Sequence, residues 1–320
     1  PDGGARMIVT VTLNPSIDRT IAVDSLKRGG VNRAELIQLD AGGKGVNVSR
    51  ALARYGAQTH AIFVGAQLGG GWFQDVLQRV GVPHTVVMAD GVTRSNITLV
   101  ESDGTVTKIN EPGVTLTETI IDEVEAAMAA LPLDGSWVVF AGRLNPGASD
   151  STYLELARFA KSRGALVAVD VSGKPLDVAL RGGVVDLIKP NQHELGEIVG
   201  RPLDTLGSVI EAAREVIDRG VTTVVCSLGR DGALYITADE ALHVEPAVQI
   251  QGTPVGAGDI LLATFIGGGA NADALVGAVQ WSAASVALPG TAIPTAEQAA
   301  AIPVTRHADL LPTRQLIEVS

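Results

Sequence analysis

The segment Val255–Asp259, which reads Val-Gly-Ala-Gly-Asp, combines small residues with a carboxylate directly before an apolar run. Small residues at a helix start allow the N–H groups of Gly256, Ala257 and Gly258 to converge on one point, where the positive helix end also favours an anion. Asp259 could simply cap the helix. Beside a bound phosphate it could instead accept the proton of an attacking hydroxyl. The residues alone leave both roles open.

A second glycine-rich turn, Gly42-Gly43-Lys44-Gly45, leads into another predicted helix, with Lys44 and Asn47 in its first turn. By itself such a turn is weak evidence, because glycines are common wherever the chain reverses sharply. Two helix starts of this kind in one chain nevertheless predict two places for polar, phosphorylated groups. Neither has the spacing of a P-loop, which occurs nowhere in the chain.

Oxygen donors follow the predicted strand at residues 184–189, in the run Lys189-Pro-Asn-Gln-His-Glu194. Ligands of open α/β sheets bind at the carboxyl ends of strands. Asn191 and Glu194 carry oxygens of the kind that magnesium prefers, directly or through water. A capped helix start explains the same spacing equally well.

The run from Ser227 to Gly232 also follows a predicted strand and contains Gly229. It could hold a nucleotide phosphate, or it could only turn the chain into the next strand.

Three isolated charged residues complete the set of candidates. Arg94 and Arg143 could clamp a phosphate, because a guanidinium fork matches phosphate oxygens. Asp18 follows the first strand and could bind sugar hydroxyls, or it could be a turn residue.

The elements that must position these residues alternate between continuous apolar strands and amphipathic helices. This alternation predicts an α/β fold, a doubly wound and mostly parallel sheet with helices on both faces, forming one domain over residues 7–320. Hairpin-like inserts at about 19–40 and 95–110 interrupt the alternation and are expected to form a small β-sheet lid. A lid with one bare apolar face would be covered by a second subunit, which predicts a homodimer. Residues 1–6 are expected to be an N-terminal extension.

The composition of the chain limits the classes of binding partner that we expect. The 320 residues carry a net charge of −11, which argues against nucleic acid or an anionic membrane as the main partner. The single cysteine excludes an internal disulfide and a cysteine-rich zinc site. There is no apolar run of the ~18 residues that a membrane span needs, and no signal-peptide pattern, so we expect a cytoplasmic protein.

These motifs together resemble the ribokinase-like carbohydrate kinases, the phosphofructokinase B family, from about Met7 to the C-terminus. The runs 255–259 and 42–47 are similar to the two signatures of that family, and three further motifs fall in the family's order. These are Thr93-Arg94-Ser95-Asn96, Lys189–Glu194 and Ser227-Leu228-Gly229. The opening run Thr12–Asp18 and the run Asn110–Gly113 are most similar to the branch of 1-phosphofructokinases and tagatose-6-phosphate kinases.

The resemblance implies phosphorylation of a sugar phosphate by ATP with Mg²⁺, most simply of fructose 1-phosphate to fructose 1,6-bisphosphate. It implies that Asp259 is the general base and that the amides of 256–258 bind the transferred phosphoryl group. The sugar phosphate would be held by Asp18, Gly42, Gly43, Lys44, Asn47 and Arg94, with Arg143 nearby. The nucleotide would be held by Lys189, Asn191, Ser227, Gly229, Gly232 and Gly258, and Mg²⁺ by Asn191 and Glu194 through water.

The chain departs from the family pattern at three places. Pro254 stands where the family has Thr, Ile260 replaces a small residue, and Arg143 lies in a segment that is commonly Ser-Gly-Ser-Leu-Pro. Arg143 adds a cation near the expected sugar site, which leaves tagatose 6-phosphate and fructose 6-phosphate as alternative substrates. A catalytically inactive nucleotide-binding regulator is a more remote alternative.

Overall fold

The computed structural model describes residues 7–307 and 309–317. The extension expected at residues 1–6 lies outside this range. No helix within it is long and apolar enough to cross a membrane.

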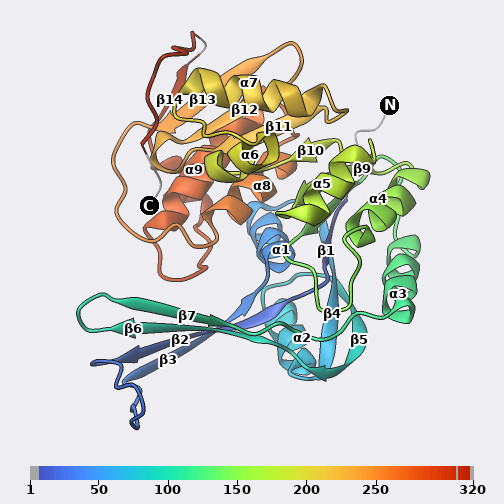
Figure 1. The fold of residues 1–320 in the computed structure, drawn as a ribbon, viewed down its shortest axis with the longest axis vertical. Coiled ribbons are helices and arrows are strands. Elements are labelled where there is room, and N and C mark those ends of the chain that lie inside the picture. Colours follow the sequence, from blue (N-terminus) through green and yellow to red (C-terminus); the bar gives the residue numbers. More distant parts are fainter. Residues whose placement is uncertain (1–6, 308, 318–320) are drawn as a thin grey trace.

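A ten-stranded sheet forms the body of the molecule (Figure 1). Its strands are β1 (Ile8–Thr12), β4 (Thr59–Leu68), β5 (His84–Val92), β8 (Trp137–Ala141), β9 (Leu166–Asp170), β10 (Leu187–Ile188), β11 (Thr223–Ser227), β12 (Ala233–Ile236), β13 (Ala241–Pro246) and β14 (Val304–His307). They lie in the order β14-β13-β12-β11-β10-β9-β8-β1-β4-β5. All pairs from β5 to β11 are parallel, and the pairs from β11 to β14 are antiparallel.

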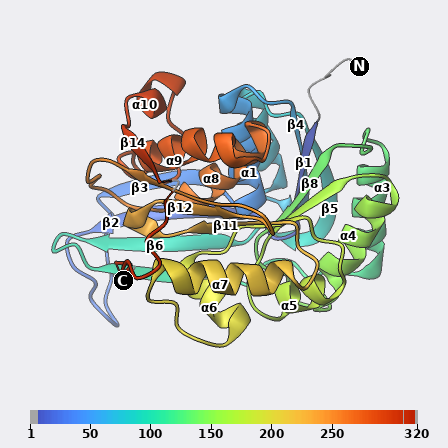
Figure 2. The same cartoon turned by 90° about the horizontal axis from the view of Figure 1, so that it is seen from above.

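Helices cover both faces of this sheet (Figure 2). One face carries α3 (Glu118–Ala129), α4 (Thr152–Ser162), α5 (Lys174–Arg181), α6 (Gln192–Val199) and α7 (Leu206–Ile217). The other carries α1 (Lys44–Tyr55), α2 (Gly70–Arg79), α8 (Ala257–Gly267), α9 (Ala272–Val286) and α10 (Ala296–Ala300). The predicted doubly wound sheet is therefore confirmed. It buries separate apolar clusters on its two faces because its strands are apolar on both.

Four further strands form a small sheet that projects from the body (Figure 1). They are β2 (Ser16–Val23), β3 (Leu36–Gly42), β6 (Ser95–Glu101) and β7 (Val106–Asn110), in the order β3-β2-β6-β7. This is the small sheet that the two inserts predicted. The central pair, β2 with β6, is parallel and joins the two inserts. No local turn signal could have indicated this pairing, because its partners are far apart in the chain.

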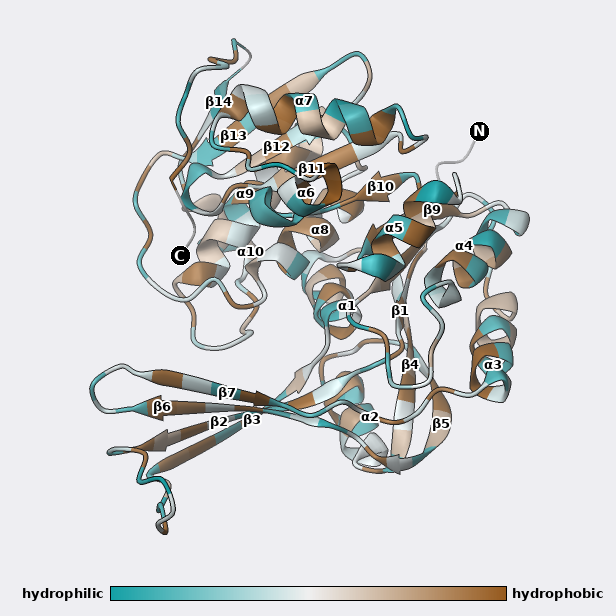
Figure 3. Cartoon of the chain, viewed as in Figure 1, coloured by the Kyte–Doolittle hydropathy of each residue, from teal (hydrophilic) through white to brown (hydrophobic). Residues whose placement is uncertain are grey.

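Several large apolar side chains of the small sheet are exposed, and its strands are coloured as apolar along much of their length (Figure 3). Leu36 is 59% exposed, Ile37 54% and Ile109 52%. Burying such surface is favourable, so this sheet carries an apolar area that the body of the chain leaves uncovered.

The local sequence explains the start and end of α1. Gly43 precedes it with a φ of 110°, which a side chain rarely adopts, and an ideal Cβ there would lie 3.1 Å from Pro15 Cα. Gly56 ends the helix in the left-handed conformation, which glycine adopts without strain.

Candidate active site

A tight turn directly before α8 leaves backbone N–H groups exposed at the start of the helix. Gly256 adopts a left-handed φ of 78° and no side chain caps the helix. The amide of Ala257 donates to the carbonyl of Pro254 at 3.1 Å. Within the described residues, the amides of Gly256 and Gly258 have no hydrogen-bond acceptor. Two of the three amides predicted to converge are thus open to a ligand, and the third is engaged by the turn.

Asp259 is buried in the first turn of α8, with 7% of its surface exposed. Its Oδ2 accepts a hydrogen bond of 2.8 Å from Asn47 Nδ2 on α1. Burial, and then the nearby negative charge of Asp170, raise the pKa of Asp259 to about 6, against the opposing effects of Asn47 and two lysines. The next residue, Ile260, is 2% exposed and packs in the apolar cluster, which accounts for its departure from a small residue.

Two lysines lie on either side of Asp170, the last residue of β9. Lys44 Nζ is 2.9 Å from Asp170 Oδ1, and Lys189 Nζ is 3.6 Å from Oδ2. Burial opposes the ionisation of Asp170, but the charges of Lys189 and Lys44 outweigh it and keep the pKa of Asp170 below its usual range. A Cβ on Gly258 would lie 3.1 Å from Lys189 Nζ, so this lysine reaches the start of α8.

Asp170 was not among the residues predicted to act. It is 2% exposed, yet it organises both lysines next to Asp259. The signal available in the sequence was its position at the end of the apolar run 165–170, because ligands bind at the carboxyl ends of such strands.

A second polar group surrounds Asp18 on β2. Its Oδ1 accepts hydrogen bonds from Ser16 Oγ at 2.7 Å and Asn96 Nδ2 at 2.9 Å. Burial raises the pKa of Asp18, although both hydrogen bonds and the charge of Arg94 oppose the rise. An ideal Cβ at Gly42 would lie 2.2 Å from Asp18 Oδ2, so only glycine fits beside this carboxylate.

Arg94 links the small sheet to the body. Its guanidinium donates to the Asn14 carbonyl at 3.3 Å and to Asn96 Oδ1 at 3.1 Å. Burial lowers the pKa of Arg94, Asp18 opposes this shift, and the positive charge of Arg143 adds to it. The charge of Arg143 is therefore close enough to disfavour the charged form of Arg94. Arg143 is exposed and has no hydrogen-bond partner among the residues described.

Asn191 and Glu194 form a reciprocal capping box at the start of α6. Asn191 Oδ1 accepts from the Glu194 amide at 2.7 Å, and Glu194 Oε2 accepts from the Asn191 amide at 2.9 Å. Burial alone would lower the pKa of Lys44, but the charges of Asp170, Asp259 and, to a smaller extent, Glu194 raise it. The described part of the chain holds no cluster of three or more acidic, histidine or cysteine residues suited to a metal ion.

The loop after β11 is joined to this region through the backbone. Ser227 pairs with Asn191 in an isolated parallel bridge. Gly229 has a φ of 59° and begins a short 3₁₀ helix, η1 (Gly229–Asp231). Gly232 has a φ of 81°, and a Cβ there would lie 2.1 Å from the Val244 carbonyl oxygen. Glycine at this position is therefore required by packing against β13.

The model of the pfkB family carbohydrate kinases matches residues 8–297. The chain belongs to this family. The resemblance inferred from the sequence motifs is thereby confirmed, and this protein is a sugar phosphotransferase.

Similar proteins carry two different names within the family. This chain is 39% identical over 259 residues to the 1-phosphofructokinase of Xanthomonas campestris pv. campestris, and the match covers 80% of this chain and 81% of the relative. It is 33% identical to the ATP-dependent 6-phosphofructokinase isozyme 2 of Escherichia coli, covering 80% and 83%. The crystal structure of phosphofructokinase-2 from Escherichia coli in complex with potassium has a TM-score of 0.87 at 30% identity, covering 93% of this chain and 98% of that one.

Proposed function

We propose that this kinase transfers the γ-phosphoryl group of ATP to fructose 1-phosphate, forming fructose 1,6-bisphosphate. The main support is Asp259, a buried carboxylate beside open amides and two lysines. Substrate choice rests on the Thr12–Asp18 and Gly42–Asn47 runs and on similarity to several 1-phosphofructokinases.

In the proposed reaction, Asp259 takes the proton of the attacking sugar hydroxyl. The hydroxyl oxygen forms a bond to the γ-phosphorus, the bond from that phosphorus to the bridging oxygen breaks, and ADP leaves. A base is most effective when its pKa lies near the working pH, and a pKa of about 6 for Asp259 fits that requirement. The amides of Gly256 and Gly258 would stabilise negative charge on the transferred group.

The sugar phosphate would lie between the two polar groups of the site. Asp18 and Asn47 supply acceptors and donors for hydroxyls, and Gly42 and Gly43 allow close approach of the backbone. Lys44, Arg94 and Arg143 supply positive charge for the substrate phosphate, which guanidiniums bind in a fork.

The nucleotide would lie along the carboxyl ends of β10 and β11, contacted by Lys189, Asn191, Ser227, Gly229, Gly232 and Gly258. Phosphoryl transfer depends on positioning and charge neutralisation more than on covalent chemistry. Lys189, which reaches Gly258, is placed to neutralise charge on the phosphate that moves.

Magnesium suits the donors available here, provided that it is held through water and the phosphates. In the capping box, Asn191 Oδ1 and one oxygen of Glu194 are already engaged, and the second oxygen of Glu194 remains. Among the described residues, Asp170 Oδ2 is buried with no hydrogen-bond partner and has only Lys189 Nζ at 3.6 Å. When bound, magnesium neutralises phosphate charge, and few protein ligands are typical of it.

We also propose that the small sheet closes over the sugar as a lid and that its apolar residues pair with those of a second copy. Leu36, Ile37 and Ile109 are exposed, and pairing would bury them. Sedimentation at equilibrium should give the mass of two chains, and a single-chain mass at micromolar concentration would reject the dimer.

A panel of sugar phosphates tests substrate choice. ADP release would be coupled to a reporter reaction with fructose 1-phosphate, fructose 6-phosphate and tagatose 6-phosphate. The highest kcat/KM is expected for fructose 1-phosphate. The relative named as a 6-phosphofructokinase isozyme makes fructose 6-phosphate the alternative, and a tenfold preference for it would replace our assignment.

A further inference from the structure

The C-terminal segment 309–317, here called the C-terminal strap, is bonded to the start of α7. The Leu206 amide donates to the Arg314 carbonyl at 3.0 Å, and the Gly207 amide donates to the Pro312 carbonyl at 2.9 Å. A Cβ on Gly207 would lie 2.8 Å from that Pro312 oxygen, so the approach is closer than a side chain allows. The strap is thus anchored through its backbone at Pro312 and at Arg314 itself.

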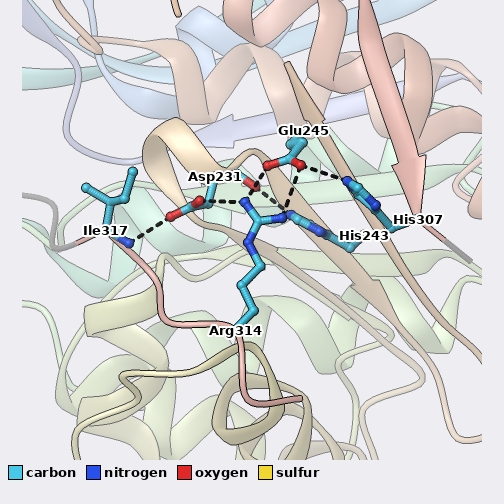
Figure 4. A network of polar contacts seen from close by, with 6 residues as sticks. All are labelled: Asp231, His243, Glu245, His307, Arg314 and Ile317. Carbon is cyan, nitrogen blue, oxygen red and sulfur yellow. Dashed lines mark hydrogen bonds and ion pairs between the residues drawn. The ribbon is translucent and has the colours of Figure 1, made fainter. Parts of the chain in front are cut away.

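Asp231, the last residue of η1, is held by the strap through both carboxylate oxygens (Figure 4). Arg314 Nη2 donates to Oδ1 at 2.8 Å, and the Ile317 amide donates to Oδ2 at 2.8 Å. Asp231 is only 4% exposed. A buried carboxylate needs such partners, because losing one leaves an uncompensated charge.

Arg314 is in turn fixed by β13. Its Nη1 donates to Glu245 Oε1 at 3.0 Å and its Nη2 donates to Oε2. The hydrogen bond from Arg314 is the main reason that the pKa of Glu245 is lowered to about 2. His307 also bonds to Glu245 Oε1, at 2.7 Å, and His243 bonds to the Asp231 carbonyl, at 2.6 Å. The Arg314 guanidinium therefore lies between two carboxylates, and both accept hydrogen bonds from it (Figure 4).

This network acts on the turn that follows β11. The Asp231 amide donates to the Leu228 carbonyl at 3.1 Å, and the Leu228 amide donates to the Gly232 carbonyl at 2.8 Å. Gly229 lies inside this closed turn. The position of its backbone therefore depends on Asp231, whose side chain is held from the other end of the chain.

We propose that Arg314 is a positioning residue for the nucleotide: through Asp231 it holds the Leu228–Gly232 turn in the conformation that contacts ATP. The inference rests on the proposed function, which assigns Ser227 and Gly229 to the nucleotide. If the network only stabilised the fold, removing it would lower the free energy of unfolding but leave the nucleotide affinity of the folded protein unchanged. Removing the Arg314 guanidinium should instead weaken the affinity for the nucleotide without changing the affinity for the sugar phosphate.

The test compares Arg314→Met with Arg201→Met in the full-length protein. Arg201 also pairs with a carboxylate, Glu215, and within the described residues no hydrogen bond or ion pair joins either of them to η1. Calorimetric titration with MgADP, without sugar, should show about a tenfold weaker affinity for Arg314→Met, as expected for losing a hydrogen bond between charged groups. KM for ATP should rise similarly, while KM for fructose 1-phosphate stays within about twofold of wild type. Arg201→Met should match wild type in all three.

Hydrogen exchange provides a readout independent of activity. The amides of Leu228, Asp231 and Gly232 should exchange faster in Arg314→Met and at the wild-type rate in Arg201→Met. If Arg314→Met does not fold, Ile317→Pro gives a second test, because it removes the amide that donates to Asp231 Oδ2 and keeps the Arg314 guanidinium. Its effects should be smaller and in the same direction.

The outcomes separate the two proposals. Wild-type protein that does not bind MgADP would overturn the proposed function, and with it this inference. Wild-type binding together with unchanged affinity in the Arg314 variant would overturn the inference alone. Unchanged exchange in the turn would do so as well.

Discussion

Helices α6 and α8 both carry an acidic residue at the third helical position, and the two residues behave in opposite ways. At α6, Glu194 turns back and accepts from the Asn191 amide, while Asn191 accepts from Glu194. At α8 the preceding residue is Gly256, which has no side chain to cap the helix, and Asp259 bonds to Asn47 on another helix. A capped start satisfies its own donors. An uncapped start leaves its donors available to a ligand, which is the arrangement that phosphoryl transfer requires.

The strongest test of this difference is Asp259→Asn. We expect kcat to fall by about 10²–10⁴-fold, because the amide cannot accept the proton of the hydroxyl. MgADP should still bind, which calorimetry would verify. Asp273→Asn serves as the control, because Asp273 is also in a first helical turn but is exposed and pairs with Arg306. Unchanged turnover in Asp259→Asn would remove the distinction between α6 and α8.

Next in size is the loss of the carboxylate between the two lysines. Asp170→Asn should lower the free energy of unfolding by about 3 kcal/mol, since it leaves the buried Lys189 without its partner. Urea denaturation measures this change. Glu215→Gln removes the acid of an exposed pair and should cost less than about 1 kcal/mol. Equal losses of unfolding free energy in both variants would mean that the burial of Asp170 does not strengthen its contribution to stability.

Acidic pH should lower the activity, because it protonates Asp259. Its pKa is raised from 3.8 to about 6, so kcat/KM should fall as pH drops below 6, by about tenfold per pH unit. Asp259→Asn should abolish this dependence. A profile that is flat down to pH 4 in folded protein would contradict a carboxylate base.

The same shift has the opposite effect on stability. The folded protein binds a proton at Asp259 more readily than the unfolded chain does between pH 3.8 and 6, so the contribution of this group to stability decreases as pH rises through that window. Wild type should therefore gain stability relative to Asp259→Asn as the pH falls from 7 to 4. Urea denaturation at several pH values measures this difference.

The smallest expected effect concerns the capped helix. Asn191→Ala should lower the free energy of unfolding by about 1 kcal/mol, as for other lost N-caps. Asn271→Ala, which removes the cap of α9, should cost a similar amount. Only Asn191→Ala should also raise KM for ATP. If both variants leave KM unchanged, Asn191 is a helix cap and nothing more.

Much of the fold was predictable because its signals are local. Apolar strands alternating with amphipathic helices indicated the layered sheet, and the glycine-rich turn at 42–45 marked the start of α1. The candidate site was predictable as separate segments, each at a strand end or helix start. Local patterns did not show that Ala257 donates to Pro254. They also did not single out Asp170, since an acid at a strand end looks the same whether it is solvated or buried.

The sequence by itself determined which segments could present backbone donors and carboxylates, because helix starts and tight turns depend on neighbouring residues. Only the tertiary structure decided which of them meet. Asn47 and Asp259 are 212 positions apart, and Lys44 and Asp170 are 126 apart. Contacts over such separations depend on the order of strands in the sheet and on the burial that follows from it. That burial, rather than residue type, makes Asp259 a poorly solvated carboxylate with a raised pKa.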